Sequence, residues 1–282
     1  MEKRARIATL DFWIIALMLS LCFGFLVYSE VIPSDFFLSE RFYKKDPHYY
    51  FKKEAHRMML CHKSFYNNEL TKYYDDPELF FKNAVFVLKS KYKNKETAVI
   101  AIDDISLVVH KYYKKNLLDY LLSIPFKPSE AFRGWYYGQI LMKNKIACSK
   151  PILVIEKRIG PYCTSSYLVT SYITGLSGYD FFKDNSPYQE KWAETTDNIQ
   201  QLLTNLNKIK VTHSDFELKS IIVKDDLPYL VDLDKLQRFR YKSTSSERIR
   251  LKKYFINLKS ELNQKESKAY QLFEDKTIIL SN

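Results

Sequence analysis

The sequence predicts an α+β fold preceded by one N-terminal transmembrane helix. Three observations lead to this expectation: an uncharged stretch near the start, a series of short β-rich runs in the middle, and long helical patterns toward the end. The chain has 282 residues, of which 46% are hydrophobic and 27% charged. These fractions are ordinary for a folded protein, and the length allows one large domain or two small ones.

Composition narrows the function classes. Only six glycines are present, and neither G-x-G-x-x-G nor G-x-x-x-x-G-K-[ST] occurs, which disfavours a Rossmann enzyme or a P-loop NTPase. The net charge of +11 favours anionic partners such as phosphates and anionic lipid. Because the basic residues are spread along the chain, we expect no nucleic acid partner. The four cysteines lack zinc-ligand spacing and are too few for a disulfide framework, which favours a reducing compartment.

Residues 12–28 read FWIIALMLSLCFGFLVY and contain no charge, so they predict a membrane anchor. A signal peptide is the rival interpretation, since Lys3, Arg4 and Arg6 form a basic start, but no A-x-A-like cleavage site follows. A buried core helix is the other alternative, although no polar face runs through the segment. The charge bias places the N-terminus in the cytoplasm and the main domain outside.

Four segments follow from the pattern: an anchor (1–30), a juxtamembrane helical region (31–82), a first lobe (83–174) and a reduced helical second lobe (175–282). The juxtamembrane region includes an expected short helix from Tyr49 to Cys61. In the first lobe, Ser129 is an expected N-cap. The expected strands are 84–90, 97–102, 105–113, 152–159 and 167–173, and the first of them are separated by charged turns such as KYKNKE, residues 91–96. The expected helices are 117–124 and 129–144.

The second lobe is expected to begin with a long helix over residues 188–209, because its apolar residues recur at helical spacing. Two short strands, 221–224 and 229–233, follow around the turn DDLP, and residues 245–274 are mainly helical and basic. Five strands with a helix after the third, followed by helices and a strand pair, match the plan of a protein-kinase-like bilobal fold, which on the elements alone is one candidate among α+β arrangements.

The stretch VTHSDFELKSIIVKDDLPYLVDLDKL, residues 211–236, carries the chemistry. Asp215 lies in a polar loop after the long helix, and Asp232 lies seventeen residues later at the end of an apolar strand. Phosphoryl transfer needs one carboxylate to accept the proton of the attacking hydroxyl and another to hold Mg²⁺. His213 is expected to pack within the loop.

This stretch resembles the catalytic and metal-binding loops of the lipopolysaccharide kinases, the Kdo and core heptose kinase family, through H-x-D-x-x-x-x-[N]-I-[IL]-V followed by h-h-D-h-D. Upstream, LVVHKYYKKNLLDYL, the 129–144 helix and YLVTSYITG resemble in order the family's third strand, its helix and its hinge. The resemblance covers residues 84–260. It implies transfer of the ATP γ-phosphate to a sugar of the lipopolysaccharide inner core, with Asp215 as the catalytic base and Asp232 as a Mg²⁺ ligand.

The sequence departs from the family pattern in several places. Ser220 replaces the metal-binding Asn and is the weaker metal ligand. The ATP-contacting lysine of the third strand aligns with His110 or with Lys111, and we prefer Lys111 because lysine carries a permanent charge. Its carboxylate partner on the helix would be Glu130, although the position where an acid is expected is Gly134.

Two functions are therefore weighed: an ATP-dependent kinase with a partly degenerate site, and a membrane-anchored pseudokinase acting as a binding or scaffold module. A third, a nucleic-acid-binding membrane protein, rests on charge alone. ATP chemistry requires the cytoplasmic side, so the kinase hypothesis overrules the charge bias. It predicts a single-pass inner-membrane protein whose basic soluble domain is cytoplasmic and is attracted to anionic membrane lipid.

Overall fold

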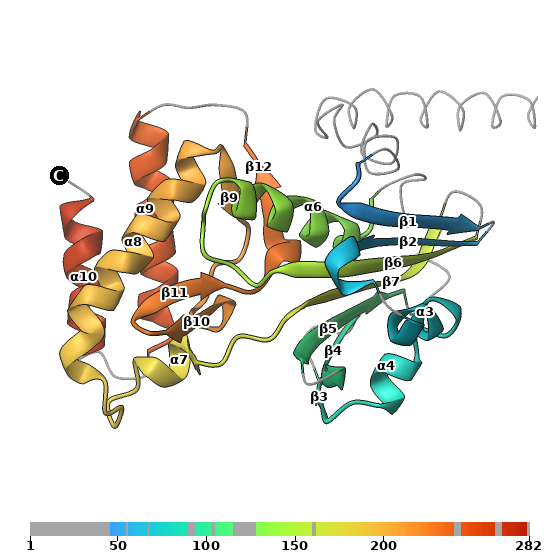
Figure 1. The fold of residues 1–282 in the computed structure, drawn as a ribbon. Coiled ribbons are helices and arrows are strands. Elements are labelled where there is room, and N and C mark those ends of the chain that lie inside the picture. The colour runs from blue at the N-terminus through green and yellow to red at the C-terminus, as the bar shows by residue number, and fades with distance from the viewer. Residues whose placement is uncertain are drawn as a thin grey trace, which may run out of the picture.

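A seven-stranded antiparallel sheet forms the first lobe (Figure 1), in the order β1-β2-β6-β7-β5-β4-β3. The computed structural model describes residues 46–54, 56–66, 68–89, 94–102, 105–114, 128–159, 162–239, 244–262 and 267–280. The strands of the sheet are β1 (Tyr49–Glu54), β2 (Arg57–His62), β3 (Phe86–Lys89), β4 (Lys95–Ile102), β5 (Ile105–Tyr113), β6 (Pro151–Ile159) and β7 (Tyr162–Ser171).

The five strands expected between residues 84 and 173 are confirmed as β3, β4, β5, β6 and β7. Three of them begin earlier than predicted: β4 at Lys95, β6 at Pro151 and β7 at Tyr162. The early start of β4 matters for the site, because a residue assigned to a charged turn becomes the first residue of a strand.

The helix expected from Tyr49 to Cys61 is wrong, since this segment forms the β1–β2 hairpin. The apolar run of β2 is buried on both faces of the sheet, and a short run of that kind cannot be told from a buried helix by periodicity. Leu60 pairs with Val154, so β2 extends the sheet beyond β6. The described part of the expected juxtamembrane region, residues 46–82, therefore belongs to the first lobe, and the expected boundary at residue 83 is wrong.

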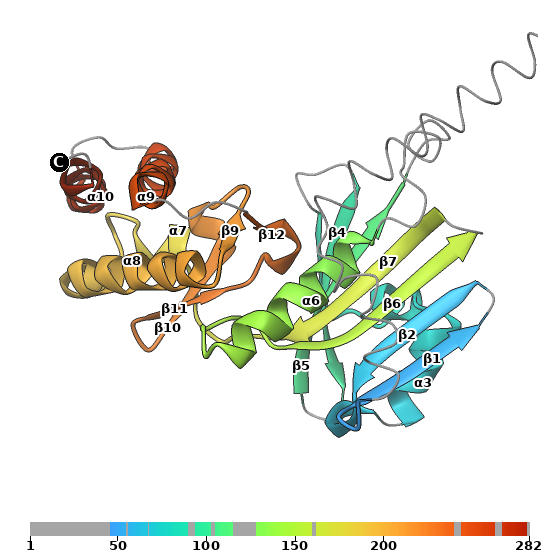
Figure 2. The same cartoon turned by 90° about the horizontal axis from the view of Figure 1, so that it is seen from above.

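Helices cover both faces of the sheet. On one face, α3 (Asn68–Asp75) and α4 (Leu79–Lys82) pack Tyr74 and Phe80 onto a cluster that includes Val109. On the other face, α6 (Glu130–Lys143) packs Trp135 against a cluster of strand residues. Figure 2 shows α6 between the sheet and the second lobe. The predicted N-cap is confirmed, because the Ser129 hydroxyl accepts a 3.0 Å hydrogen bond from the Phe132 N–H.

The second lobe is mainly helical and lies beyond the end of β7 (Figure 1). The predicted long helix is α8, and the predicted basic helical segment is two helices, α9 and α10, packed against each other. Two small antiparallel sheets, β11-β10-β8 and β12-β9, join the helices. The elements are β8 (Leu176–Ser177), α7 (Gly178–Phe181), α8 (Trp192–Lys208), β9 (Val211–His213), β10 (Ile221–Lys224), β11 (Leu227–Leu230), β12 (Leu236–Arg238), α9 (Thr244–Ser260) and α10 (Lys268–Ile279).

Four short 3-10 helices complete the described structure: η1 (Lys63–Phe65), η2 (Gln189–Lys191), η3 (Leu218–Ser220) and η4 (Leu233–Lys235). Within the described ranges, no helix combines the length and the apolar character needed to cross a bilayer. The expected anchor (12–28) and the expected helix 117–124 both lie outside the described residues.

Candidate active site at the junction of the lobes

The loop that carries Asp215 connects β9 to η3 and is fixed along its length to the segment that carries Asp232. Before the loop, His213 of β9 pairs with Leu236 of β12. Within it, the Ser214 N–H donates to the carbonyl oxygen of Lys235 at 2.9 Å, and at its end the Val231 N–H donates to the carbonyl oxygen of Ser220 at 3.0 Å. These backbone bonds hold the two segments side by side.

His213 holds the main chain of Asp232. Its side chain is buried, and Nε2 lies 3.1 Å from the Asp232 carbonyl oxygen, while the edge of the ring packs against Phe216. Burial lowers the pKa of His213, more than the nearby Asp232 carboxylate raises it. A neutral, buried histidine of this kind positions the loop, which agrees with the packing role expected from the sequence.

Helix α9 ties the same loop from behind. The Tyr254 hydroxyl accepts a 2.9 Å hydrogen bond from the His213 N–H and donates to the His213 carbonyl oxygen at 3.2 Å. Just after α9, Glu261 Oε1 accepts a 2.8 Å hydrogen bond from the Leu218 N–H. The loop is therefore held at both of its ends, by the segment of Asp232 and by α9.

Lys95 of the sheet meets two carboxylates of the second lobe. Its Nζ lies 3.1 Å from Asp232 Oδ1 and 3.0 Å from Asp234 Oδ1. The exposed fraction is 11% for the Lys95 side chain, 5% for Asp234 and 33% for Asp232, so only Asp232 is open to solvent. This ion-paired group defines the junction of the two lobes.

The ionisation of the group follows from its contacts. Burial opposes the charge of Asp234, but the Lys95 ammonium outweighs it and lowers the pKa of the Asp234 carboxyl. In the same way, burial opposes the charge of Lys95, but Asp232 and Asp234 raise its pKa. Lys95 and Asp234 are therefore both charged at neutral pH.

Comparison with protein-family models gives a match to the "Lipopolysaccharide kinase (Kdo/WaaP) family" over residues 82–271 of the 282. The chain belongs to this family. It is a family of kinases, which agrees with the resemblance seen in residues 84–260. Comparison with curated protein sequences returned no match.

Comparison with solved structures gives matches at low identity, two of which follow. One is WaaP in complex with acyl carrier protein, at 14% identity and a TM-score of 0.47, covering 72% of this chain and 83% of that one. The other is a divergent kinase lacking the glycine-rich loop, which regulates membrane ultrastructure of the Toxoplasma parasitophorous vacuole. It shares 20% identity at a TM-score of 0.40, covering 63% of this chain and 61% of that one.

The two candidates for the family's third-strand lysine lie on opposite faces of β5. Lys111 points to the face covered by α4, where Nζ lies 2.8 Å from Glu78 Oε2 and 3.7 Å from Glu96 Oε2. His110 points to the face of Lys95, and its Nδ1 lies 2.9 Å from Thr97 Oγ1. The preference for Lys111 as the side chain that faces the site is therefore wrong.

His110 does not supply a charge in place of the lysine. Its side chain is buried, and burial, aided by the neighbouring Lys95 charge, lowers the pKa of His110 to about 4. The imidazole is neutral at pH 7. It fills the third-strand position as a hydrogen-bonding core residue.

Glu130 does not meet Lys111. It lies exposed in the first turn of α6, where an acid stabilises the helix dipole, and α6 covers the sheet face opposite to Lys111. Gly134 stands where an acid was expected, and a Cβ there would lie 2.6 Å from Leu168 Cδ2 and 3.3 Å from the Asp234 nitrogen. A side chain at this position would have to displace the end of Leu168 and would press on the backbone of η4.

Ser220 does not present its hydroxyl as a metal ligand. The side chain is buried, and Oγ accepts a 3.3 Å hydrogen bond from the Glu217 N–H and donates to the Asp215 carbonyl oxygen at 3.5 Å. Both bonds close the loop on itself. The serine therefore shapes the Asp215 loop, and the expectation that it coordinates Mg²⁺ does not fit this geometry.

The carboxylates of Asp232 and Asp234 fit a magnesium ion, because Mg²⁺ is bound by one or two carboxylates with substrate phosphates completing its coordination. Asp232 is the better placed of the two, since it keeps a third of its side chain exposed. Across the described ranges, no group of three or more His, Cys, Asp or Glu side chains gathers as a metal site. A Mg²⁺ ion held here by one or two carboxylates would complete its coordination with water and phosphate oxygens.

Sequence reasoning missed Lys95 and Asp234. Lys95 lay in the charged run KYKNKE, which was interpreted as a turn, although it stands two residues before Thr97 and so shares its face of the strand. Asp234 was part of the h-h-D-h-D pattern but received no role of its own.

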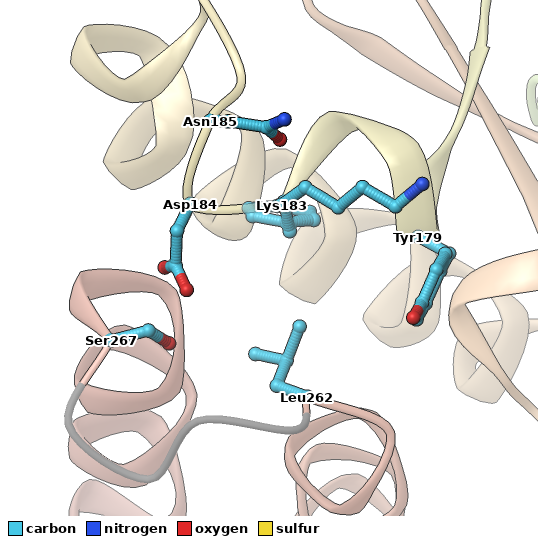
Figure 3. Close-up of a pocket in the computed structure, with 7 residues that line it drawn as sticks. Tyr179, Lys183, Asp184, Asn185, Leu262 and Ser267 are labelled. Atoms are coloured by element: carbon cyan, nitrogen blue, oxygen red, sulfur yellow. The ribbon is translucent and has the colours of Figure 1, made fainter.

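A separate pocket of about 310 Å³ lies in the second lobe (Figure 3), and Leu262 and Ser267 form the wall at the ends of α9 and α10. Tyr179 and Lys183 of the α7 region line the opposite side (Figure 3). The Nζ of Lys219, in the Asp215 loop, lies 5.8 Å from the centre of the Tyr179 ring. The pocket thus adjoins the loop but includes none of the site residues above.

Proposed function

We propose that this chain transfers the γ-phosphate of ATP to a sugar hydroxyl of the lipopolysaccharide inner core. The observation that carries the proposal is the pairing of two chain segments. The loop of Asp215 is hydrogen-bonded along its length to the segment of Asp232, at the point where Lys95 of the first lobe reaches the second. Membership of the lipopolysaccharide kinase family supports a phosphotransferase and a sugar acceptor.

The roles of the two aspartates follow from their surroundings. Asp215 lies in a loop fixed by Ser214 and Ser220, which suits a group that orients the acceptor hydroxyl and accepts its proton. Asp232 is partly exposed and would hold Mg²⁺. Bound Mg-ATP would supply the phosphoryl group and a metal ion that offsets the negative charge of the phosphates. His213 keeps Asp232 in register with the loop through its main chain.

Two substitutions separate these roles. Asp232→Ala should abolish the rise in melting temperature that ATP produces in the presence of Mg²⁺, since a ligand stabilises only the state that binds it. Asp215→Asn should leave that rise nearly unchanged while phosphate transfer to core oligosaccharide falls at least roughly a hundredfold, the lower end of general-base contributions. Transfer is measured from labelled ATP into lipopolysaccharide that lacks the modification.

Asp225→Asn is the matched control, because this exposed aspartate lies in the β10–β11 turn at a φ of 50°, a conformation that Asn accepts readily. It should change neither measurement. Tight Mg-ATP binding without transfer to any core acceptor would favour the alternative, a pseudokinase, which the replacements Gly134, Ser220 and His110 suggest. Transfer that survives Asp215→Asn would place the base elsewhere.

A further inference from the structure

Lys95 and His110 occupy neighbouring positions on one face of the sheet. In the register of β4 and β5, His110 lies opposite Thr97 and Lys95 lies opposite Tyr112, so these four side chains share the face that looks toward α6 and η4. Lys95 and His110 are diagonal neighbours, at a spacing of about 7–8 Å between Cα atoms that long side chains can bridge. A lysine at either position can reach the same point at the lobe junction.

We propose that Lys95, the first residue of β4, supplies the cation that contacts the nucleotide phosphates. Asp234 holds this lysine, in place of an acid on α6. This inference rests on the proposed kinase function. It names the residue that supplies the positive charge which His110 does not supply. Lys95 is a permanent point charge suited to phosphate, whereas His110 at the third-strand position is buried and neutral.

The environment of Lys95 supports a role beyond internal pairing. One ammonium group contacts two carboxylates, Asp232 and Asp234, so the group keeps one negative charge in excess. Asp234 is the buried member and can stay with the lysine, while Asp232 is the exposed member and is available to a divalent cation. The positive charge of Mg²⁺ on Asp232 and the negative charge of a phosphate beside Lys95 would then offset each other at the lobe junction.

The structure also explains why α6 does not provide the partner acid. Gly134 is packed against Leu168 and the backbone of Asp234, so an acidic side chain there would have to displace Leu168 and press on η4. The neighbouring Arg133 uses its Nε to donate to the Asp234 carbonyl oxygen at 2.8 Å, which fixes η4 against the helix. With η4 this close, Asp234 stands where it can hold the lysine itself.

The experiment measures by calorimetry how tightly the full-length protein binds ATP and adenosine, each in the presence of Mg²⁺. Lys95→Met should weaken ATP binding by about tenfold to a hundredfold, the range for a charge-assisted hydrogen bond, and leave adenosine binding unchanged. Lys111→Met is the matched control, because that lysine lies on the opposite face with Glu78. It should leave the binding of both ligands unchanged.

Two double variants guard against a folding defect. Lys95→Met/Asp234→Asn removes the buried pair together and should show the same selective loss of ATP binding. Lys95→Met/His110→Lys moves the charge to the neighbouring strand and should recover most of the ATP affinity.

Each contrary outcome has a distinct meaning. The inference would be overturned if Lys95→Met bound ATP as tightly as the parent. It would also be overturned if Lys95→Met and Lys95→Met/Asp234→Asn lost ATP binding and adenosine binding equally. In either case the lysine would only form a structural ion pair. A parent protein that binds no Mg-ATP would instead refute the proposed function.

Discussion

At the scale of one residue, Glu261 holds the end of the Asp215 loop through a carboxyl group whose ionisation the fold disfavours. Burial raises the pKa of this carboxyl to about 7, the Leu218 N–H lowers it, and the nearby Glu217 and Asp215 raise it further. Its ordinary value is 4.5, so the folded protein resists ionisation of Glu261. The stability that it contributes is complete below pH 4.5 and is lost as the pH rises through 7.

Glu261→Gln should therefore flatten the dependence of stability on pH. The amide oxygen can still accept from Leu218 but carries no charge. Because Glu261 is only half-buried, solvent screening reduces the gain at pH 8 to about 1 kcal/mol, or ~2–4 °C in melting temperature. At pH 4.5 the variant and the parent should melt together.

Thermal unfolding followed by circular dichroism between pH 4.5 and 8 measures this, with the exposed Glu190→Gln as control. The same gain at both ends of the range would show that titration of Glu261 is not the cause.

At the scale of elements, the β1–β2 hairpin completes the first lobe. Strand β2 pairs along β6 and buries Met59 toward the α3–α4 face and Leu60 toward the α6 face. Without the hairpin, β6 would be an open edge with unpaired backbone groups. The family match begins at residue 82, so the hairpin lies outside the matched segment although it belongs to the same sheet.

Leu60→Ala should lower the free energy of unfolding by about 2–5 kcal/mol, because it opens a cavity among fully buried neighbours. The melting temperature should fall by ~5–15 °C. Leu227→Ala removes the same atoms from a side chain that is 48% exposed and should have little effect. Equal shifts in the two variants would contradict the placement of β2 in the core.

At the scale of the whole molecule, the sheet lobe and the helical lobe meet through η4, the ion pairs of Lys95 and helix α6. Figure 2 shows α6 between the two lobes. We propose that residues 12–28 anchor the protein in the inner membrane with residues 31–282 in the cytoplasm, where ATP is available. Residues 31–282 contain 41 basic and 30 acidic residues, a charge that favours contact with anionic lipid.

A C-terminal alkaline phosphatase fusion tests this orientation. The fused enzyme is active only outside the cytoplasm, so we expect no phosphatase activity, and a fluorescent protein fused at the same point should be bright. An active phosphatase fusion would put the domain on the side without ATP and would contradict both the orientation and the kinase proposal.

The sequence by itself determined most of the elements, the β1–β2 hairpin excepted, and the local part of the site. Apolar alternation predicted the five strands β3, β4, β5, β6 and β7, and Ser129 predicted the start of α6. Only a short hairpin, β10–β11, joins the segments of Asp215 and Asp232, and backbone hydrogen bonds hold these segments side by side. These are short-range relations, so propensity and spacing along the chain suffice to find them.

The tertiary structure decided which charges meet. Lys95 and Asp232 are separated by 137 residues, and their contact depends on the register of β4 and on the closeness of α6 to η4. A charged run predicts a solvated turn because burying a charge is costly, yet here two carboxylates of the other lobe offset that cost for Lys95. Side-chain alternation placed Lys111 and His110 on opposite faces, but only packing against α4 and α6 determined which face holds the site.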